Sequence, residues 1–130
     1  MSLSDRQHAF SRAIAELLYW MKQRGYQWSM RDCWRSTDTL NCSHCGHEVT
    51  YQGLLVYNKR SKTLKSAHLD GCALDLILWK DGQPVYDGDA YRPLGEYWEG
   101  LGGTWGGRFG VARDRYGVEV GWDPGHVEFN

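Results

Sequence analysis

The sequence predicts an α+β fold in which helices pack against a small antiparallel sheet. Two stretches have helical patterns: residues 4–24 repeat apolar side chains at helical spacing, and residues 91–99 place Pro93 in a first turn. The other apolar runs are short, β-prone and bounded by turns, as in residues 76–79. With 130 residues and a hydrophobic content of 42%, the chain is predicted to form one domain, residues 1–130, around one core.

The first predicted helix spans residues 4–24. Ser4 and Gln7 form a capping-box pattern at its start, and Gly25 follows its end as a stop signal. Its apolar stripe is interpreted as a core-packing face instead of a partner-binding face. Residues 26–30 then alternate as a strand does.

The second half of the chain predicts a central strand, a hairpin, a helix and a final strand. The strand at residues 76–79 turns back at Asp81-Gly82, the strongest two-residue hairpin signal. The helix at residues 91–99 is expected to pack Leu94, Tyr97 and Trp98 inward. The glycine-rich residues 100–108 are expected to pass close to a cleft, with Trp105 as its wall or as a platform for substrate.

A histidine and an aspartate flank the start of the central strand. His68 precedes a turn at Gly71, and Asp75 lies on the strand that follows, seven residues after His68. A carboxylate on a buried strand needs a partner, because an unpaired buried charge is very costly. A metal ion bound by both side chains would satisfy it, and so would a His–Asp hydrogen bond without a metal.

The end of the chain adds a second group of candidate ligands. His126 follows Asp123 by three residues and precedes Glu128 by two, with a turn at Pro124-Gly125 between. Two histidines and one aspartate give the three protein ligands that are typical of catalytic zinc. Asp123 is placed to accept a proton from a zinc-bound water, and Glu128 is either a rival base or a residue that orients His126.

These motifs resemble those of a family of zinc peptidases. Ser66-x-His68-x6-Asp75, followed by Asp123-x-x-His126, is similar to the pattern of D-Ala-D-Ala carboxypeptidases, dipeptidases and L-alanyl-D-glutamate endopeptidases. Further similarity lies in Cys33-Trp-Arg-Ser36 and in residues 91–109, so it extends over about residues 25–129. The most similar group is the small single-domain phage endolysins, which cut the peptide stems of bacterial peptidoglycan.

The resemblance implies a fold, an activity and a set of roles. The fold would be that of D-Ala-D-Ala carboxypeptidases and hedgehog-like domains, with the sheet carrying the metal ligands. The activity would be zinc-dependent hydrolysis of a stem bond, at L-alanyl-D-glutamate or, alternatively, at D-Ala-D-Ala. Zinc would be bound by His68, Asp75 and His126, with Asp123 as the base.

The same resemblance assigns roles in substrate binding. Arg35 would stabilise the oxyanion or bind a substrate carboxylate, because its planar guanidinium suits both. Ser66 would hydrogen-bond substrate near the metal. The resemblance also implies a short helix at residues 51–58, and residues 110–121 are longer than the family pattern, so the cleft is expected to differ in shape.

Residues 37–49 resemble an insertion in the family pattern and are rich in cysteine and histidine. Cys42-x-x-Cys45 followed by Gly46 is typical of a zinc-knuckle turn, and His47 or His44, with Cys33, could complete four ligands. A second, structural zinc, free thiols and a redox pair are the open alternatives. The cluster also keeps open a different function, a zinc-stabilised binding module without catalytic activity.

Composition and charge limit the partners and the compartment. A net charge of −1 without long basic runs argues against nucleic acid as a partner. No apolar run is long enough for a membrane span, and the first residues have no signal-peptide pattern. These observations predict no stable membrane association and synthesis in the cytosol. The resemblance to phage endolysins implies that this is the host cytosol and that the protein acts on the cell wall after release. We also expect a monomer. In that compartment the four cysteines are expected to be thiols or metal ligands.

Overall fold

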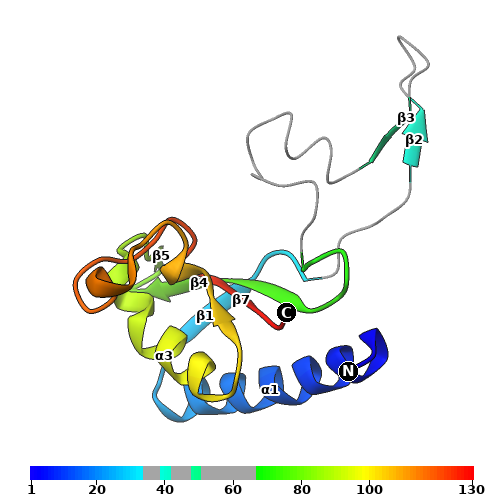
Figure 1. Cartoon of the computed structure of the whole chain (residues 1–130). Coiled ribbons are helices and arrows are strands. Elements are labelled where there is room, and N and C mark those ends of the chain that lie inside the picture. The colour runs from blue at the N-terminus through cyan, green and yellow to red at the C-terminus, as the bar shows by residue number, and fades with distance from the viewer. Residues whose placement is uncertain (34–38, 42–47, 51–66) are drawn as a thin grey trace.

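The structure is a computed structural model that describes residues 1–33, 39–41, 48–50 and 67–130. An open antiparallel sheet has the strand order β1-β4-β7-β6, with β5 also paired to β4, and the helices α1 and α3 pack against it (Figure 1). The predicted α+β fold is confirmed. The elements are α1 (Leu3–Gln23), β1 (Gln27–Met30), β2 (Thr39–Asn41), β3 (Glu48–Thr50), β4 (Ala73–Lys80), β5 (Gln83–Pro84), α3 (Arg92–Gly100), β6 (Thr104–Trp105) and β7 (His126–Glu128), with short 3-10 helices at Gly88–Tyr91, Gly106–Arg108 and Arg113–Arg115.

The start of α1 differs from the prediction. Ser2 is the N-cap, and it forms the capping box with Asp5, whose backbone N–H donates to the Ser2 hydroxyl at 3.0 Å. The Ser4–Gln7 pair predicted for this role has a different environment, because the Gln7 side chain donates to the backbone carbonyl of Asp70 at 2.7 Å. Gln7 therefore makes a tertiary contact in place of the predicted cap with Ser4.

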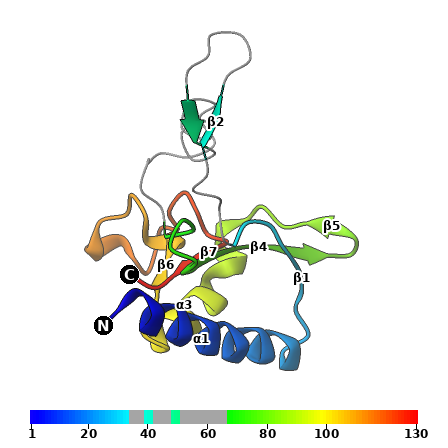
Figure 2. The same ribbon diagram turned by 90° about the vertical axis from the view of Figure 1, so that its right-hand side faces the viewer.

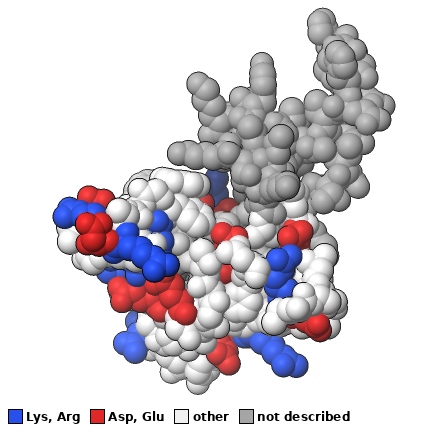
Figure 3. Space-filling model, in the orientation of Figure 1, with Lys and Arg blue, Asp and Glu red and all other residues white. Residues whose placement is uncertain are grey.

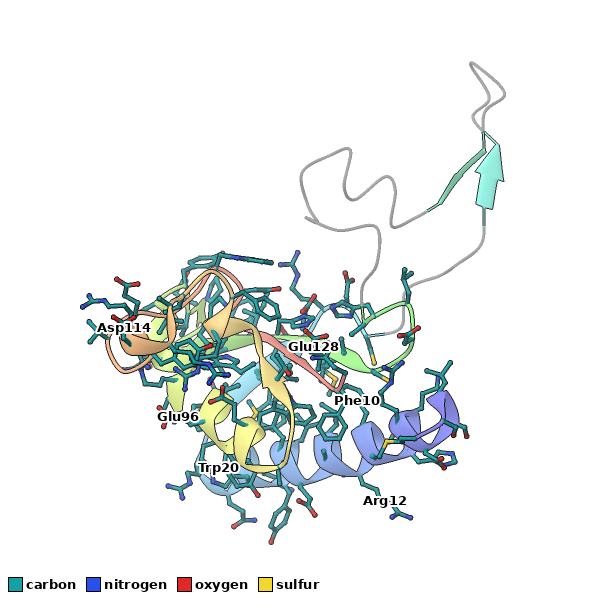
Figure 4. All side chains as sticks on the ribbon, in the orientation of Figure 1. Phe10, Arg12, Trp20, Glu96, Asp114 and Glu128 are labelled. Atoms are coloured by element: carbon teal, nitrogen blue, oxygen red, sulfur yellow. The ribbon has the colours of Figure 1, made fainter. Side chains whose placement is uncertain are left out.

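The end of α1 agrees with the prediction. Gly25 has a φ of +80°, and the N–H groups of Gly25 and Tyr26 donate to the carbonyls of Lys22 and Met21. This pattern satisfies carbonyls that the last turn would leave unpaired. Phe10 points from α1 toward the sheet and Arg12 points away from it (Figure 4). The buried stripe that faces the core consists of Phe10, Ala13, Leu17 and Met21.

The central strand β4 separates the core from the opposite face of the sheet. Its even-numbered residues Leu74, Leu76 and Leu78 are at most 3% exposed and belong to the core on the side of the helices. Figure 2 shows both helices beneath the strands. Successive strand residues point to opposite faces. Asp75 and Ile77 consequently lie on the face away from the helices.

The helix α3 has the predicted inward face and connects the core to the last strands. Leu94 and Trp98 are fully buried, and Tyr97 stacks on Trp20 with ring centroids 4.6 Å apart. The Trp98 indole N–H lies within hydrogen-bond distance of the carbonyls of Thr104 in β6 and Glu128 in β7. This contact joins α3 to the edge of the sheet that carries the second histidine.

The predicted hairpin after β4 is also confirmed. Lys80 pairs with Gln83, and the two residues between them, Asp81 and Gly82, have φ values of +53° and +75°. Both positive values are typical of the tight turn that Asp-Gly favours. The hairpin places β5 on the edge of β4 opposite β1.

A long segment, residues 109–121, is anchored by Arg108. The guanidinium makes two hydrogen bonds to the carboxylate of Glu99, at 3.0 and 2.9 Å, and donates to the carbonyl of Tyr116. It also lies over the rings of Trp105 and Tyr116. Figure 3 shows basic and acidic side chains close together at this end of the molecule, which the label of Asp114 marks in Figure 4.

Among the described residues, no helix is long and apolar enough to cross a membrane.

Candidate metal centre

The register of β4 and β7 brings Asp75 and His126 together. They are direct partners in the antiparallel ladder, and the Nδ1 atom of His126 lies 2.9 Å from Oδ1 of Asp75. Side chains of directly opposed residues share a face of the sheet. The predicted position of His126 beside the Asp75 strand is thereby confirmed, although 51 residues separate the two in sequence.

His68 reaches the same carboxylate from the turn that precedes β4. The residue is 1% exposed, and its Nε2 atom lies 3.2 Å from Oδ2 of Asp75. Its Nδ1 atom lies 2.8 Å from the backbone carbonyl of Cys33. A carbonyl only accepts, so Nδ1 donates its proton there, and Nε2 is the ring nitrogen that faces Asp75.

These three side chains form a group that could hold a metal ion. One ligand atom from each of His68, Asp75 and His126 lies within 4.8 Å of the others. Two imidazoles and one carboxylate are a donor set that zinc accepts, and three protein ligands leave one of four tetrahedral positions for water. The chemistry of the donors therefore fits the zinc ion that the sequence analysis expects.

In this group, hydrogen bonds and nearby charges together outweigh the effect of burial on the pKa values. Burial alone would raise the pKa of Asp75, but hydrogen bonds from His126 and His68 hold it well below its usual range. Burial alone would lower the pKa of His126, but hydrogen bonds with Asp75 and Glu128 raise it to about 9. At neutral pH the metal-free site therefore keeps a protonated His126, and a metal ion must displace that proton to bind.

The two remaining acidic candidates contact different nitrogens of His126. The Asp123 carboxylate lies 3.8 Å from Nδ1, on the side of Asp75, and its side chain is 38% exposed. The Glu128 carboxylate lies 3.4 Å from Nε2, and its side chain is 13% exposed. Figure 4 labels Glu128 on the last strand, beside the sheet. Of the two roles open to Glu128, its position favours orienting the ring over acting as the base.

Close backbone packing holds the turn that carries Asp123 and His126. The N–H of Leu76 in β4 donates to the carbonyl of Gly125 at 2.8 Å. A Cβ atom at Gly125 would collide with the Leu76 carbonyl, and one at Gly106 would collide with the Asp123 carbonyl. The expectation that the glycine-rich run passes close to the site holds for Gly106.

Trp105 has a different role from the one predicted. The side chain is fully buried, and its indole N–H donates to the carbonyl of Pro124 at 2.7 Å. Gly95 and Gly107 lie so close to the ring that a Cβ atom at either would overlap it. A side chain at 0% exposure does not line a substrate cleft, so Trp105 supports the turn before His126 from within the core.

Several predicted site residues lie outside the described residues. They are Arg35, Ser66, the implied helix at 51–58 and the cysteine and histidine cluster of Cys42, Cys45, His47 and His44. Cys33 is described, and it is an exposed free cysteine. Although the residue is exposed as a whole, partial burial of its thiol, together with the nearby Asp75 and Cys72, raises the pKa of that thiol.

The sequence analysis missed two contacts and a groove at the site. The backbone carbonyl of Cys33 orients His68, and a backbone role gives no signal in a side-chain pattern. Phe109 packs against His126, with ring centroids 5.5 Å apart. An open groove of about 350 Å³ next to Asp75 and Asp123 is lined in part by Arg31 and Tyr86.

The fold and the site together define a small α+β protein with an open antiparallel sheet, on which three side chains form a group that could hold a metal ion. Among solved structures, the chain is similar to the Serratia marcescens L-Ala D-Glu endopeptidase ChiX. The match has a TM-score of 0.59 and 19% sequence identity, and it covers 98% of this chain and 85% of that chain. No family model and no curated protein matches the sequence. At this identity the likeness establishes the fold.

Proposed function

We propose that this protein is a zinc-dependent peptidase that hydrolyses peptide-stem bonds of bacterial peptidoglycan, with the L-alanyl-D-glutamate bond as its substrate. The observation that carries the proposal is the convergence of His68, Asp75 and His126 within 4.8 Å. The fold supports it, because the similar structure from Serratia marcescens is an L-Ala D-Glu endopeptidase.

The proposed roles follow from the positions of the acidic side chains. A zinc ion at the site would lower the pKa of a bound water to about 7 and would polarise the scissile carbonyl. Asp123, partly exposed beside Nδ1 of His126, accepts a proton from the attacking water and returns it to the leaving amine. Glu128 keeps the ring of His126 in place through Nε2. Arg35 stabilises the oxyanion, and Ser66 hydrogen-bonds substrate.

The biological setting is proposed from the sequence resemblance to phage endolysins. We infer a monomeric lysin that is made in the host cytosol and reaches the wall after release, with peptidoglycan as its partner. Lysis of cells whose outer membrane has been permeabilised from outside would measure this activity directly.

The test of the function is digestion of purified peptidoglycan by the zinc-loaded protein, followed by mass analysis of the fragments. Cleavage at L-alanyl-D-glutamate exposes a new amino group on D-glutamate, whereas a D-Ala-D-Ala carboxypeptidase or dipeptidase releases D-alanine. We expect the first product from the wild type. Asp123→Asn should lower kcat by at least a hundredfold, since a positioned base contributes about 10² to 10⁴.

A matched control separates loss of the base from loss of the fold. Asp114 lies in an exposed 3-10 helix of residues 113–115, so Asp114→Asn should keep full activity. Circular dichroism must show the same folded state for both variants. Wall binding without any hydrolysis by the wild type would instead support a non-catalytic binding module.

A further inference from the structure

Arg31 follows β1 and lies on the sheet face that carries the metal centre. The register of β1 and β4 ends with the pair Met30 and Leu76, and Arg31 is the next residue after Met30. The backbone N–H of Arg31 donates to the carbonyl of Asp75 at 2.9 Å. The Asp75 N–H donates in turn to the carbonyl of Asp32 at 2.8 Å, so Arg31 and Asp32 both lie beside Asp75. Arg31 and Asp75 line the same groove, which places them on the same face of the sheet.

The open groove of about 350 Å³ extends from this point across the sheet. Asp75 and Ile77 of β4 contribute to its lining, together with Arg31 on the β1 side. On the opposite edge of β4 lie Tyr86 and Trp122, which are 85% and 54% exposed. A guanidinium and two exposed aromatic rings therefore border a groove that reaches the proposed reaction site.

The charge of Arg31 is available to a ligand. Within residues 1–33 and 67–130, Arg31 forms no ion pair, whereas four other arginines bind carboxylates: Arg6, Arg92, Arg108 and Arg115. The carboxylates of Asp75 and Asp123 line the same groove but are directed to the histidines. An exposed guanidinium in this position offers parallel N–H donors to an incoming anion.

We propose that Arg31 binds a carboxylate of the peptide substrate in this groove, and that it is thereby a specificity-determining residue. The inference rests on the proposed function and deepens it. Arg pairs with carboxylates through two parallel hydrogen bonds, which give selectivity for the ionised group over its amide. In a peptidoglycan stem the carboxylate is either the α-carboxylate of the γ-linked D-glutamate or the carboxylate of the terminal D-alanine.

The test measures binding and turnover with matched peptides. The binding probe is γ-D-glutamyl-L-lysyl-D-alanine, which contains no L-alanyl-D-glutamate bond, in three forms: unmodified, amidated at the D-glutamate α-carboxylate, and amidated at the C-terminus. Each is titrated calorimetrically into zinc-loaded wild type, Arg31→Met, Arg31→Lys and the control Arg12→Met. Arg12 is exposed on the outer face of α1, so its variant should behave as wild type.

We expect Arg31→Met to weaken binding of the unmodified peptide by about tenfold to a hundredfold, since a hydrogen bond to a charged group contributes about 1.5–3 kcal/mol. The amide that blocks the recognised carboxylate should bind wild type and Arg31→Met equally, and this identifies which carboxylate is bound. Arg31→Lys should recover part of the loss. Equal selectivity for carboxylate over amide in wild type and Arg31→Met overturns the inference.

Turnover separates this inference from the proposed function. If Arg31→Met cleaves L-alanyl-D-glutamate substrates with unchanged KM and unchanged preference for D-glutamate over its α-amide, the function stands and the inference falls. If the wild type cleaves no stem bond but its binding still depends on Arg31, the carboxylate site stands and the function falls.

Discussion

At the scale of single residues, His126 uses both of its ring nitrogens. Nδ1 faces Asp75 and Asp123, and Nε2 faces Glu128. Proteins commonly fix a histidine ligand by hydrogen-bonding the nitrogen that does not bind the metal. His68 follows the same rule with the Cys33 carbonyl as its partner, so each histidine is oriented by a group outside the donor set.

Replacing Glu128 by Gln should therefore weaken metal binding without removing a ligand. Loss of the carboxylate lowers the basicity of the His126 ring and loosens its orientation, and we expect zinc affinity to fall by about 10- to 100-fold. Competition with a chromophoric chelator measures the change. Glu119→Gln is the control, because Glu119 is an exposed partner of Arg115. An unchanged affinity in Glu128→Gln would refute the orienting role.

The raised pKa of His126 makes the stability of the metal-free protein depend on pH. A pKa of about 9 in the folded state, against 6.5 in the unfolded state, means that folding favours the protonated ring. The stabilisation is complete below pH 6.5 and is lost as the pH rises to 9, with a magnitude of about 3 kcal/mol.

Denaturant titration of chelator-treated protein at pH 6 and at pH 9 measures this loss of unfolding free energy. His126→Gln should show a much smaller decline between the two values, because the titrating group is gone. A decline of the same size in that variant would assign the effect to other groups.

At the scale of elements, the candidate metal centre depends on how closely the turn before β7 approaches β4. The Gly125 carbonyl accepts from Leu76, and the backbone at Gly125 lies against the Leu76 carbonyl without room for a Cβ atom. This contact sets the position of Asp123 and His126 relative to Asp75. A single added methyl group at this point should disturb all three.

We predict that Gly125→Ala lowers the unfolding free energy by about 2 kcal/mol, in the range of overpacking a tightly packed site. Zinc affinity should fall with it, because His126 moves relative to Asp75. Gly117→Ala is the matched control: its Cβ atom would meet nothing within 4 Å, so little change is expected. Thermal unfolding and chelator competition on both variants test the prediction, and equal behaviour of the two would contradict it.

At the scale of the whole molecule, α1 is tied to the turn that carries His68. Arg6 pairs with the carboxylate of Asp70 at 2.9 Å, and Gln7 donates to the Asp70 carbonyl. The same helix buries its apolar face in the core beneath the sheet (Figure 2). The first helix, the central strand and the last strand thus all contribute to the geometry of one site.

The number of metal ions per chain distinguishes the possible sites across the whole protein. We expect His68→Ala to lose one zinc ion relative to wild type in elemental analysis, with the exposed His8→Ala as control. A fall from two zinc ions to one would indicate a second, structural site in residues 37–49. A fall from one to none would indicate that the site at Asp75 is the only zinc site. An unchanged count would refute His68 as a ligand.

The sequence predicted those parts of the fold that depend on local patterns. The two helices, the stop at Gly25 and the Asp81-Gly82 hairpin follow from spacing and turn chemistry, and the structure has each of them. The pairing of the Asp75 and His126 strands was also predicted, because the two motifs that contain these residues were expected to bind the same metal ion.

The remaining features depend on contacts between distant residues. Ser2 and Ser4 each precede a possible capping partner by three residues, but Ser2 forms the capping box with Asp5, while Gln7 contacts the distant Asp70. Trp105 lies in a glycine-rich run that suggested an open cleft, but Gly95 and Gly107 make room for its ring inside the core. No local pattern encodes which ring nitrogen of His126 meets Glu128.

The hydrogen bond from Trp105 to Pro124 gives the protein a built-in spectroscopic probe. The indole proton is buried, and its acceptor Pro124 lies two residues before His126 along the chain. The proton should therefore exchange slowly with solvent and have a resolved nuclear magnetic resonance signal. Any ligand that moves the turn before His126 changes the length of this bond and with it the chemical shift. One resonance, observed without labelling the substrate, could then follow the occupancy of the site.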